Sequence, residues 1–192
     1  MNPKIDLIGE HDASMIVLSA MKKLASDIRE NKHFDLYRIA QIIEFLRTYI
    51  DHCHHDKEEL ILFPNLVETD VPWVVDTIHL LMDEHIIARG YVNAMDTSLR
   101  EYVNGHTYSI ESLASNMVNY ITLAENHMKI ENQALLPLTD RFFNRTKLES
   151  ISLDFKHIQE REIDHYKHLE FYILLRKLYT ETMIRYENEY AN

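Results

Sequence analysis

Hydrophobic residues recur at three- and four-residue intervals along most of the chain, which is the spacing of one face of an α-helix. This pattern predicts five helices, which cover approximately residues 9–30, 34–62, 72–104, 109–135 and 147–188. Because the connections between the first four helices are short and rich in turn-forming residues, consecutive helices are expected to lie antiparallel. The pattern therefore predicts an all-α protein, with an up-down-up-down four-helix bundle over residues 1–145 and an additional C-terminal helix, within residues 146–192, packed on the bundle.

The two halves of the predicted bundle repeat the same polar residues. The second helix carries His54, Glu58 and Pro64, and the fourth carries histidine, glutamate and proline at the same spacing, at positions 127, 131 and 137. The first and third helices each carry a Glu-His pair, at 10–11 and 84–85. Two such helix pairs, packed together, would bring four histidines and two glutamates towards a pseudo-twofold centre. Pro64 is expected to end the second helix.

Helical periodicity predicts which of these side chains face the interior. His54 follows Ile50 by one turn, so it lies on the apolar face, and Glu58 lies one turn further along the same face. His55 follows Asp51 and is expected to face outward. By the same reasoning, the remaining inward-facing polar side chains are His11, His85, His127 and Glu131.

A metal site explains this set better than six separate core residues do. A single inward-facing histidine is usually a hydrogen-bonded core or boundary residue. Six ionisable groups at matched spacing are different, because each buried carboxylate or imidazole without a partner costs several kcal/mol of solvation free energy. A shared cation would satisfy all of them at once.

The types of ligand indicate which metal and which chemistry. Imidazole and carboxylate ligands without thiolates suit iron, and manganese or zinc less exclusively. Glutamates on two helices can bridge two ions, and two six-coordinate ions offer roughly twelve positions. Four histidines, two bridging glutamates and a bridging oxo or hydroxo group leave two positions for a fifth histidine, water, O2 or another small ligand. Such an open site favours small-molecule chemistry over a purely structural role.

The segments HHDKEELILFP (54–64) and HMKIENQALLP (127–137) resemble the hemerythrin-like (HHE cation-binding) family, and the similarity covers about residues 8–140. The resemblance implies a four-helix bundle around a non-haem di-iron centre. It also implies four terminal histidine ligands and two bridging glutamates, namely His11, His54, His85, His127, Glu58 and Glu131. Members of this family bind O2 reversibly, sense oxygen or iron, or act on peroxide or nitric oxide.

One position departs from the oxygen-carrying members of the family. Those proteins have a fifth histidine one turn along the third helix, where this chain has Arg89, and the departure counts against reversible oxygen carriage. The predicted fifth helix offers His165, on one stripe with Phe155 and Glu162, as a further metal ligand, and His168 less favourably. In the interpretation favoured here, that helix only covers the bundle.

Charge and composition narrow the partners and the compartment. The formal net charge is −11 and no basic block could cradle phosphates, so neither nucleic acid nor an anionic membrane is an expected partner. The one cysteine, Cys53, cannot form an internal disulfide, which is typical of a reducing cytoplasm, and it is expected to pack. Residues 1–10 lack the apolar core of a signal peptide, and no apolar run approaches the length of a membrane span. We therefore expect a cytoplasmic protein.

The sequence thus favours a protein with two iron ions that binds, senses or reacts with O2, peroxide or nitric oxide. Whether it turns over as an enzyme, and whether it forms a homodimer, is left open. Two other functions remain: storage, delivery or repair of iron or iron centres, and a helical interaction module without metal. The other histidines, His52 and His55 among them, are expected to be surface or packing residues.

Overall fold

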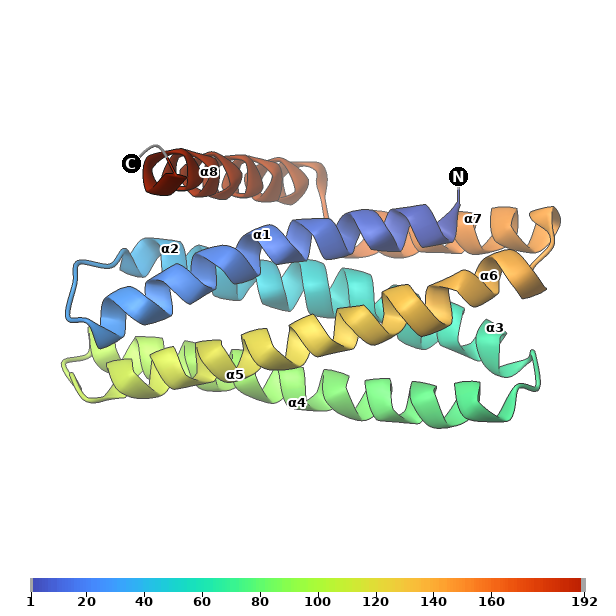
Figure 1. Cartoon of the computed structure of the whole chain (residues 1–192), viewed down its shortest axis with the longest axis horizontal. Helices are drawn as coiled ribbons and strands as arrows, with labels where there is room; N and C mark the ends of the chain where they lie inside the picture. Colours follow the sequence, from blue (N-terminus) through green and yellow to red (C-terminus); the bar gives the residue numbers. More distant parts are fainter. Residues whose placement is uncertain (1, 191–192) are drawn as a thin grey trace.

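The computed structural model describes the backbone of residues 2–190 and the side chains of residues 2–182, and every regular element in this part of the chain is helical. This confirms the predicted all-α class. Four long rods lie side by side, and successive rods are connected at opposite ends of the molecule (Figure 1). No helix in the described part of the chain is both long and apolar enough to cross a membrane.

The first and third rods are single α-helices, α1 (Pro3–Arg29) and α4 (Pro72–Val103). The second and fourth rods combine α-helical segments with π-helical ones, labelled η. The second rod consists of α2 (Leu36–Phe45), η1 (Leu46–His55), η2 (Glu58–Leu62) and α3 (Phe63–Val67). The fourth consists of α5 (Ser109–Ile130), η3 (Glu131–Leu135) and α6 (Leu136–Phe142). Two further helices follow, α7 (Arg145–Glu162) and α8 (His165–Tyr190).

Pro64 does not end the second rod as expected, because the helix continues to Val67. The segment η2 ends two residues before this proline, and η3 stands in the same relation to Pro137. Proline has no N–H and its ring clashes with the carbonyl four residues back in a regular α-helix. A π-helical turn is wider and bonds five residues back, so it accommodates the proline without breaking the rod.

The predicted fifth helix is in fact two helices, because the backbone at Ile163 is extended, with φ −128° and ψ 107°. Asp164 then begins the next helix, since its side-chain oxygen accepts a hydrogen bond from the backbone N–H of Lys167 at 2.8 Å. The chain changes direction at this break, and α8 lies beside α1 on the outside of the bundle (Figure 1). The prediction that Glu162 and His165 share one helical face is therefore wrong.

The buried apolar residues form two clusters, separated along the rods by a polar layer. On α1, Leu7 belongs to one cluster and Val17 to the other, with His11 between them. On α4, Leu81 and Ala88 belong to different clusters, and a histidine again lies between them. The other two rods repeat this order. All the residues of the four rods that were predicted to be metal ligands lie in this polar layer.

Candidate metal centre

The polar layer brings together six of the residues that the sequence singled out. They come from all four rods and are His11 (α1), His54 (η1), Glu58 (η2), His85 (α4), His127 (α5) and Glu131 (η3). None of the six is more than 6% exposed. Buried ionisable groups of this kind require partners, because burial without them is costly.

The potential ligand atoms fall into two groups, and within each group all of them lie within 4.8 Å of one another. One group contains His11 and His54, and the other contains His85 and His127. Both groups contain the same two glutamates. The carboxylates therefore lie where they could bridge two cations.

The glutamate oxygens are the part of the layer that most requires a ligand. All four carboxylate oxygens of Glu58 and Glu131 are buried without a hydrogen-bond partner. One oxygen of Glu131 lies 3.2 Å from Nε2 of His11, and the other lies 3.2 Å from Nε2 of His127. Glu58 has the same relation to the other two histidines, at 3.5 Å. Each carboxylate thus faces both histidine groups, and a pair of cations would satisfy all four oxygens.

Each of the four histidines directs Nε2 towards the centre and Nδ1 towards an outer hydrogen-bond partner. The Nε2 atoms of His11 and His54 lie 3.2 Å apart, and those of His85 and His127 lie 3.0 Å apart. The outer partners are Asn132 for His11 (2.9 Å), Glu10 for His54 (2.8 Å), Glu59 for His85 (2.7 Å) and Glu84 for His127 (2.8 Å). Such a second hydrogen bond orients the ring and makes Nε2 the ligand atom, as in carboxylate–histidine–metal arrangements.

Sequence reasoning missed these four outer partners, although they follow the internal repeat. Glu10 and Glu84 each precede a histidine of the layer and each contacts the histidine of a different rod. Glu59 and Asn132 each follow one of the two shared glutamates. The Glu-His pairs were visible in the sequence, but periodicity on a single helix does not show a contact between helices.

Lys57 makes the outer layer asymmetric. Its ammonium group, only 1% exposed, contacts the carboxylate of Glu10 and lies 3.5 Å from the amide oxygen of Gln159 and 5.8 Å from the ring centre of Phe155. The equivalent position in the second half of the repeat is Ile130. Helix α7 supplies both Gln159 and Phe155, so it packs beside the polar layer.

Charges within the layer shift the pKa values of its members. Burial alone would lower the pKa of His127, but the adjacent Glu131 outweighs burial and raises this pKa to about 10. Burial would raise the pKa of Glu131, but His127 and His11 hold it well below its usual range. The pKa of His11 is raised by Glu131, and that of His85 by Glu58, in each case against the effect of burial. Without metal, these shifts favour a protonated His127 beside an ionised Glu131, so metal binding by His127 would release a proton.

His55 lies in the layer, contrary to the prediction that it faces outward. It is 6% exposed, and its ring stacks on that of His85 with the ring centres 3.8 Å apart. A ligand nitrogen from each of His55, His85 and His127 lies within 4.8 Å of the others. Burial, and then the neighbouring His85, lower the pKa of His55 well below its usual range, so its imidazole is neutral and able to bind a cation.

The surroundings of Asp51 explain why periodicity placed His55 wrongly. Nδ1 of His55 lies 3.5 Å from a carboxylate oxygen of Asp51, so the two side chains do share one side of the rod. That side faces α4, because Asp51 bonds to Arg89 at 2.5 Å and both residues line a cleft between η1 and α4. A polar residue one turn earlier therefore did not mark a solvent-facing side.

The structure does not bring His165 into the layer. This residue begins α8, its side chain is exposed, and none of the potential metal-ligand groups among the described residues includes it. Together with His168 it lines a separate cleft, of about 530 Å³, against residues of α1, η1 and α7. The break at Ile163 is the reason, because it separates His165 from the face of α7 that packs on the bundle.

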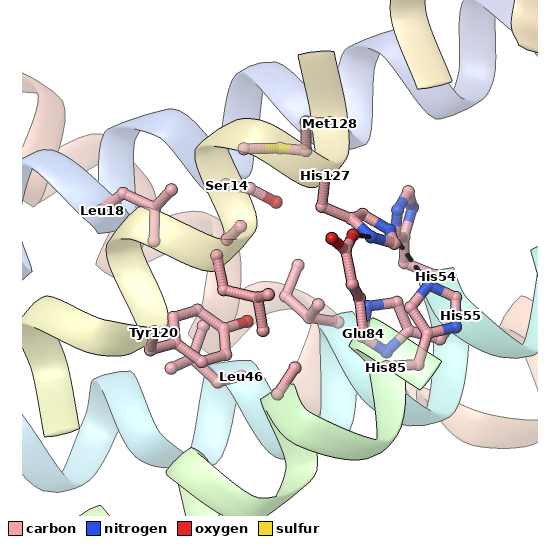
Figure 2. Close-up of a pocket in the computed structure, with 14 residues that line it drawn as sticks. Ser14, Leu18, Leu46, His54, His55, Glu84, His85, Tyr120, His127 and Met128 are labelled. Carbon is pink, nitrogen blue, oxygen red and sulfur yellow. Dashed lines mark hydrogen bonds and ion pairs between the residues drawn. The ribbon is translucent and has the colours of Figure 1, made fainter. Parts of the chain in front are cut away.

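A cavity of about 30 Å³, here called the inner cavity, reaches the layer at His54, His55, His85 and His127. Much of the rest of its wall is apolar, and Tyr120 directs its hydroxyl into it (Figure 2). The volume corresponds to about one water molecule. The cavity therefore has room for a small molecule beside the polar layer.

The donor set fits two first-row transition-metal ions. Five imidazoles and two carboxylates converge on the layer. Cys53 is buried but belongs to none of these groups. Iron, manganese and zinc all accept imidazole and carboxylate ligands.

Comparison with known proteins agrees with this reading of the site. The family model described as the hemerythrin HHE cation binding domain matches residues 6–139. The match includes all seven converging residues and ends within α6, so α7 and α8 lie beyond it. No curated protein and no solved structure matches the chain.

Proposed function

The chain belongs to the hemerythrin HHE cation-binding family, and we propose that its polar layer holds two iron ions and binds or reacts with O2 or a related small molecule. The observation that carries the proposal is the position of Glu58 and Glu131, which are shared between two histidine groups and leave four buried oxygens without hydrogen-bond partners. Two cations would satisfy these oxygens. The mixture of imidazole and carboxylate favours iron, with manganese and zinc as the alternatives.

In this proposal the two histidine groups hold different ions. His11 and His54 would hold one ion, and the other would be held by His85, His127 and His55. The two glutamates would bridge the ions. A pair of ferrous ions, when bound, supplies two electrons to a small oxidant such as O2.

His55 makes the two ions unequal. The ion beside His85 would have three imidazole ligands, whereas the ion beside His11 would have two. For two six-coordinate ions, His55 would fill one of the two positions that the other ligands leave open. The remaining position would then belong to the ion of His11 and His54, of which His54 lines the inner cavity, and it would take the small ligand. Arg89, which replaces the fifth histidine of oxygen carriers, instead pairs with Glu59 at 2.7 Å.

The surrounding residues would protect and orient the small ligand. The inner cavity is small, so it excludes bulk water and larger molecules. Tyr120 is 4% exposed, and burial raises its pKa, so its hydroxyl stays protonated and can donate a hydrogen bond to a molecule in the cavity. Outer hydrogen bonds hold the histidine rings in place, which preserves the site when the ligand leaves.

Metal analysis and rapid mixing test the proposal. Protein produced with ample iron should contain about two iron ions per chain, which the variant His54→Ala should lose and the exposed control His52→Ala should keep. The reduced protein should then be mixed with O2 in a stopped-flow spectrometer. A lasting charge-transfer absorption would indicate reversible binding, and a rapidly decaying one would indicate a reaction.

The same measurements separate the rival functions. Iron storage or delivery requires exchangeable ions, so rapid loss of iron to a mild chelator would favour it. The deep burial of the ligands and their outer hydrogen bonds support retention instead. An interaction module without metal would show no bound iron, manganese or zinc.

A further inference from the structure

A second cavity lies against the inner one. This outer cleft, of about 240 Å³, is lined by η1 on one side and α4 on the other. Residues Leu46, His55, Ala88 and Tyr120 line both the outer cleft and the inner cavity. These shared side chains therefore lie between the cleft and the cavity beside the polar layer.

We propose that the outer cleft is the entrance to the metal layer for a small uncharged molecule, and that Leu46, Ala88 and Tyr120 form the constriction that selects it. The proposal rests on the proposed function, because it takes the inner cavity to be the place where that molecule binds. It adds the path, the residues that control it and the class of molecule that can pass.

The side chains of the constriction are buried and uncharged. Leu46, Tyr120 and Ala88 are 2%, 4% and 8% exposed. The aliphatic members offer no hydrogen bond, and the hydroxyl of Tyr120 stays protonated. A charged molecule passing this wall would lose its hydration and gain only the hydroxyl of Tyr120 as a partner, whereas O2 and nitric oxide would lose little.

The mouth of the cleft is polar, but its positive charges are already paired. Arg89 bonds to Asp51 at 2.5 Å and to Glu59 at 2.7 Å. Arg47 bonds to Asp96 at 3.1 Å. Each arginine thus has a carboxylate partner, so the cleft is not built to capture an anion. The Arg89–Asp51 and Arg47–Asp96 pairs also tie η1 to α4, which holds the two walls of the cleft at a fixed separation.

Two substitutions should obstruct this path at different depths. Ala88→Leu enlarges a side chain of the constriction, and Asn93→Trp places a large side chain at the exposed mouth, where it does not disturb the core. Ala124→Leu is the matched control, because Ala124 lines the inner cavity from α5 but does not line the outer cleft. Iron content and thermal stability should be measured for every variant.

The probe is nitric oxide, added without oxygen to the reduced, iron-loaded protein. An obstruction in a path slows arrival and escape equally, so Asn93→Trp, which lies outside the inner cavity, should lower both the association and the dissociation rate by an equal factor and leave Kd unchanged. Ala88→Leu should lower the association rate further, on the order of tenfold, and should also change Kd because Ala88 lines the inner cavity as well. Ala124→Leu should instead change Kd, because it alters the space in which the molecule binds.

Three results would overturn the proposal that the outer cleft is the entrance. The first is an unchanged association rate in both Ala88→Leu and Asn93→Trp. The second is a change in Kd with an unchanged association rate in Ala88→Leu, which would place this residue in the binding space alone. The third is an equal slowing of both rates by Ala124→Leu, which would place the path between α1 and α5. These results leave the metal site standing, whereas a wild-type chain that takes up no iron overturns the proposed function and the entrance with it.

Discussion

Replacing Glu84 with glutamine should weaken metal binding while leaving the fold nearly intact, whereas the same change at Glu10 should weaken both. The two residues occupy equivalent positions in the repeat, and each accepts a hydrogen bond of 2.8 Å from Nδ1 of a ligand histidine. They differ in one respect, because Glu10 also contacts the buried ammonium of Lys57. Comparing the two variants therefore separates two effects. Both variants lose the charge that orients a ligand histidine, but only Glu10→Gln also leaves the buried ammonium of Lys57 without a counter-charge.

The expected loss of metal affinity is similar in both variants. Glutamine can still accept the hydrogen bond from histidine, but it does not supply the negative charge that makes the ring a better ligand. Removing an outer partner of this kind typically costs about 10- to 100-fold in metal affinity, which is roughly 1.4–2.7 kcal/mol. In the metal-free protein, Glu84→Gln converts a charge-assisted hydrogen bond into a neutral one, at about 1 kcal/mol of unfolding free energy.

Glu10→Gln carries a second cost, because it leaves Lys57 without its carboxylate. The ammonium is 1% exposed, and Gln159, at 3.5 Å, offers only a neutral oxygen. Breaking a buried pair by removing one partner costs about 3–5 kcal/mol. The two variants should thus differ by roughly 3–5 kcal/mol in the unfolding free energy of the metal-free protein, which is a difference of about 1.5–2.5 M in the urea midpoint.

Competition with a chelator gives the metal affinity, and urea unfolding of the metal-free protein gives the stability. The double variant Glu10→Gln with Lys57→Met removes both charges, so it should recover at least about 2 kcal/mol relative to Glu10→Gln alone. Equal urea midpoints for Glu10→Gln and Glu84→Gln would refute the role assigned to Lys57. An unchanged metal affinity in Glu84→Gln would refute the role assigned to the outer carboxylates.

Three further outcomes are expected. Under chelator competition, His55→Ala should retain about one metal ion per chain, while the exposed control His52→Ala should retain about two. Mass spectrometry of the metals measures this, and equal retention in both variants would show that His55 is not a metal ligand. The unfolding free energy of the metal-free protein should fall as pH rises, because the pKa of His127 is raised to about 10 in the folded chain. The stabilisation from this histidine is complete below pH 6.5, the ordinary pKa that it has in the unfolded chain, and is lost as the pH passes about 10. Melting temperatures between pH 6 and pH 10 check this, and Glu131→Gln should flatten the slope. Cys53 should react with a thiol reagent only as fast as the protein unfolds, because burial raises its pKa to about 11 and covers it; fast labelling of the native protein would contradict this.

The internal repeat predicted much of the site, because the same side chains recur at matched positions in both halves. The six residues taken from it do meet in one buried layer. Periodicity succeeded where the backbone is α-helical, as at His11 on α1 and His85 on α4. It misplaced His55, because Asp51 was taken to mark a solvent-facing side, whereas Asp51 bonds to Arg89 of α4 at 2.5 Å and His55 lies beside it.

The remaining errors have local causes of a similar kind. Pro64 looked like a helix end because its ring is incompatible with a regular α-helix, but a π-helical segment precedes it. The apolar stripe through residues 155–172 looked continuous, yet Asp164 caps a new helix and redirects the chain. Outer residues such as Glu10 and Lys57 make their contacts between rods, so periodicity along a single rod does not predict these contacts.

The polar layer also divides the hydrophobic core into two halves, and this affects cooperativity. Leu7 and Leu66 belong to the cluster at one end of the rods, and Met21 and Ile39 belong to the cluster at the other. Metal ions bound by residues of all four rods would couple the two ends, so the loaded chain is expected to unfold as one unit. Without them this coupling is lost, and local opening of one end should need less free energy than unfolding of the whole chain. Loss of metal would then loosen one end of the bundle while the other end stays folded. The metal occupancy of the site would in this way control the conformation of one end of the bundle.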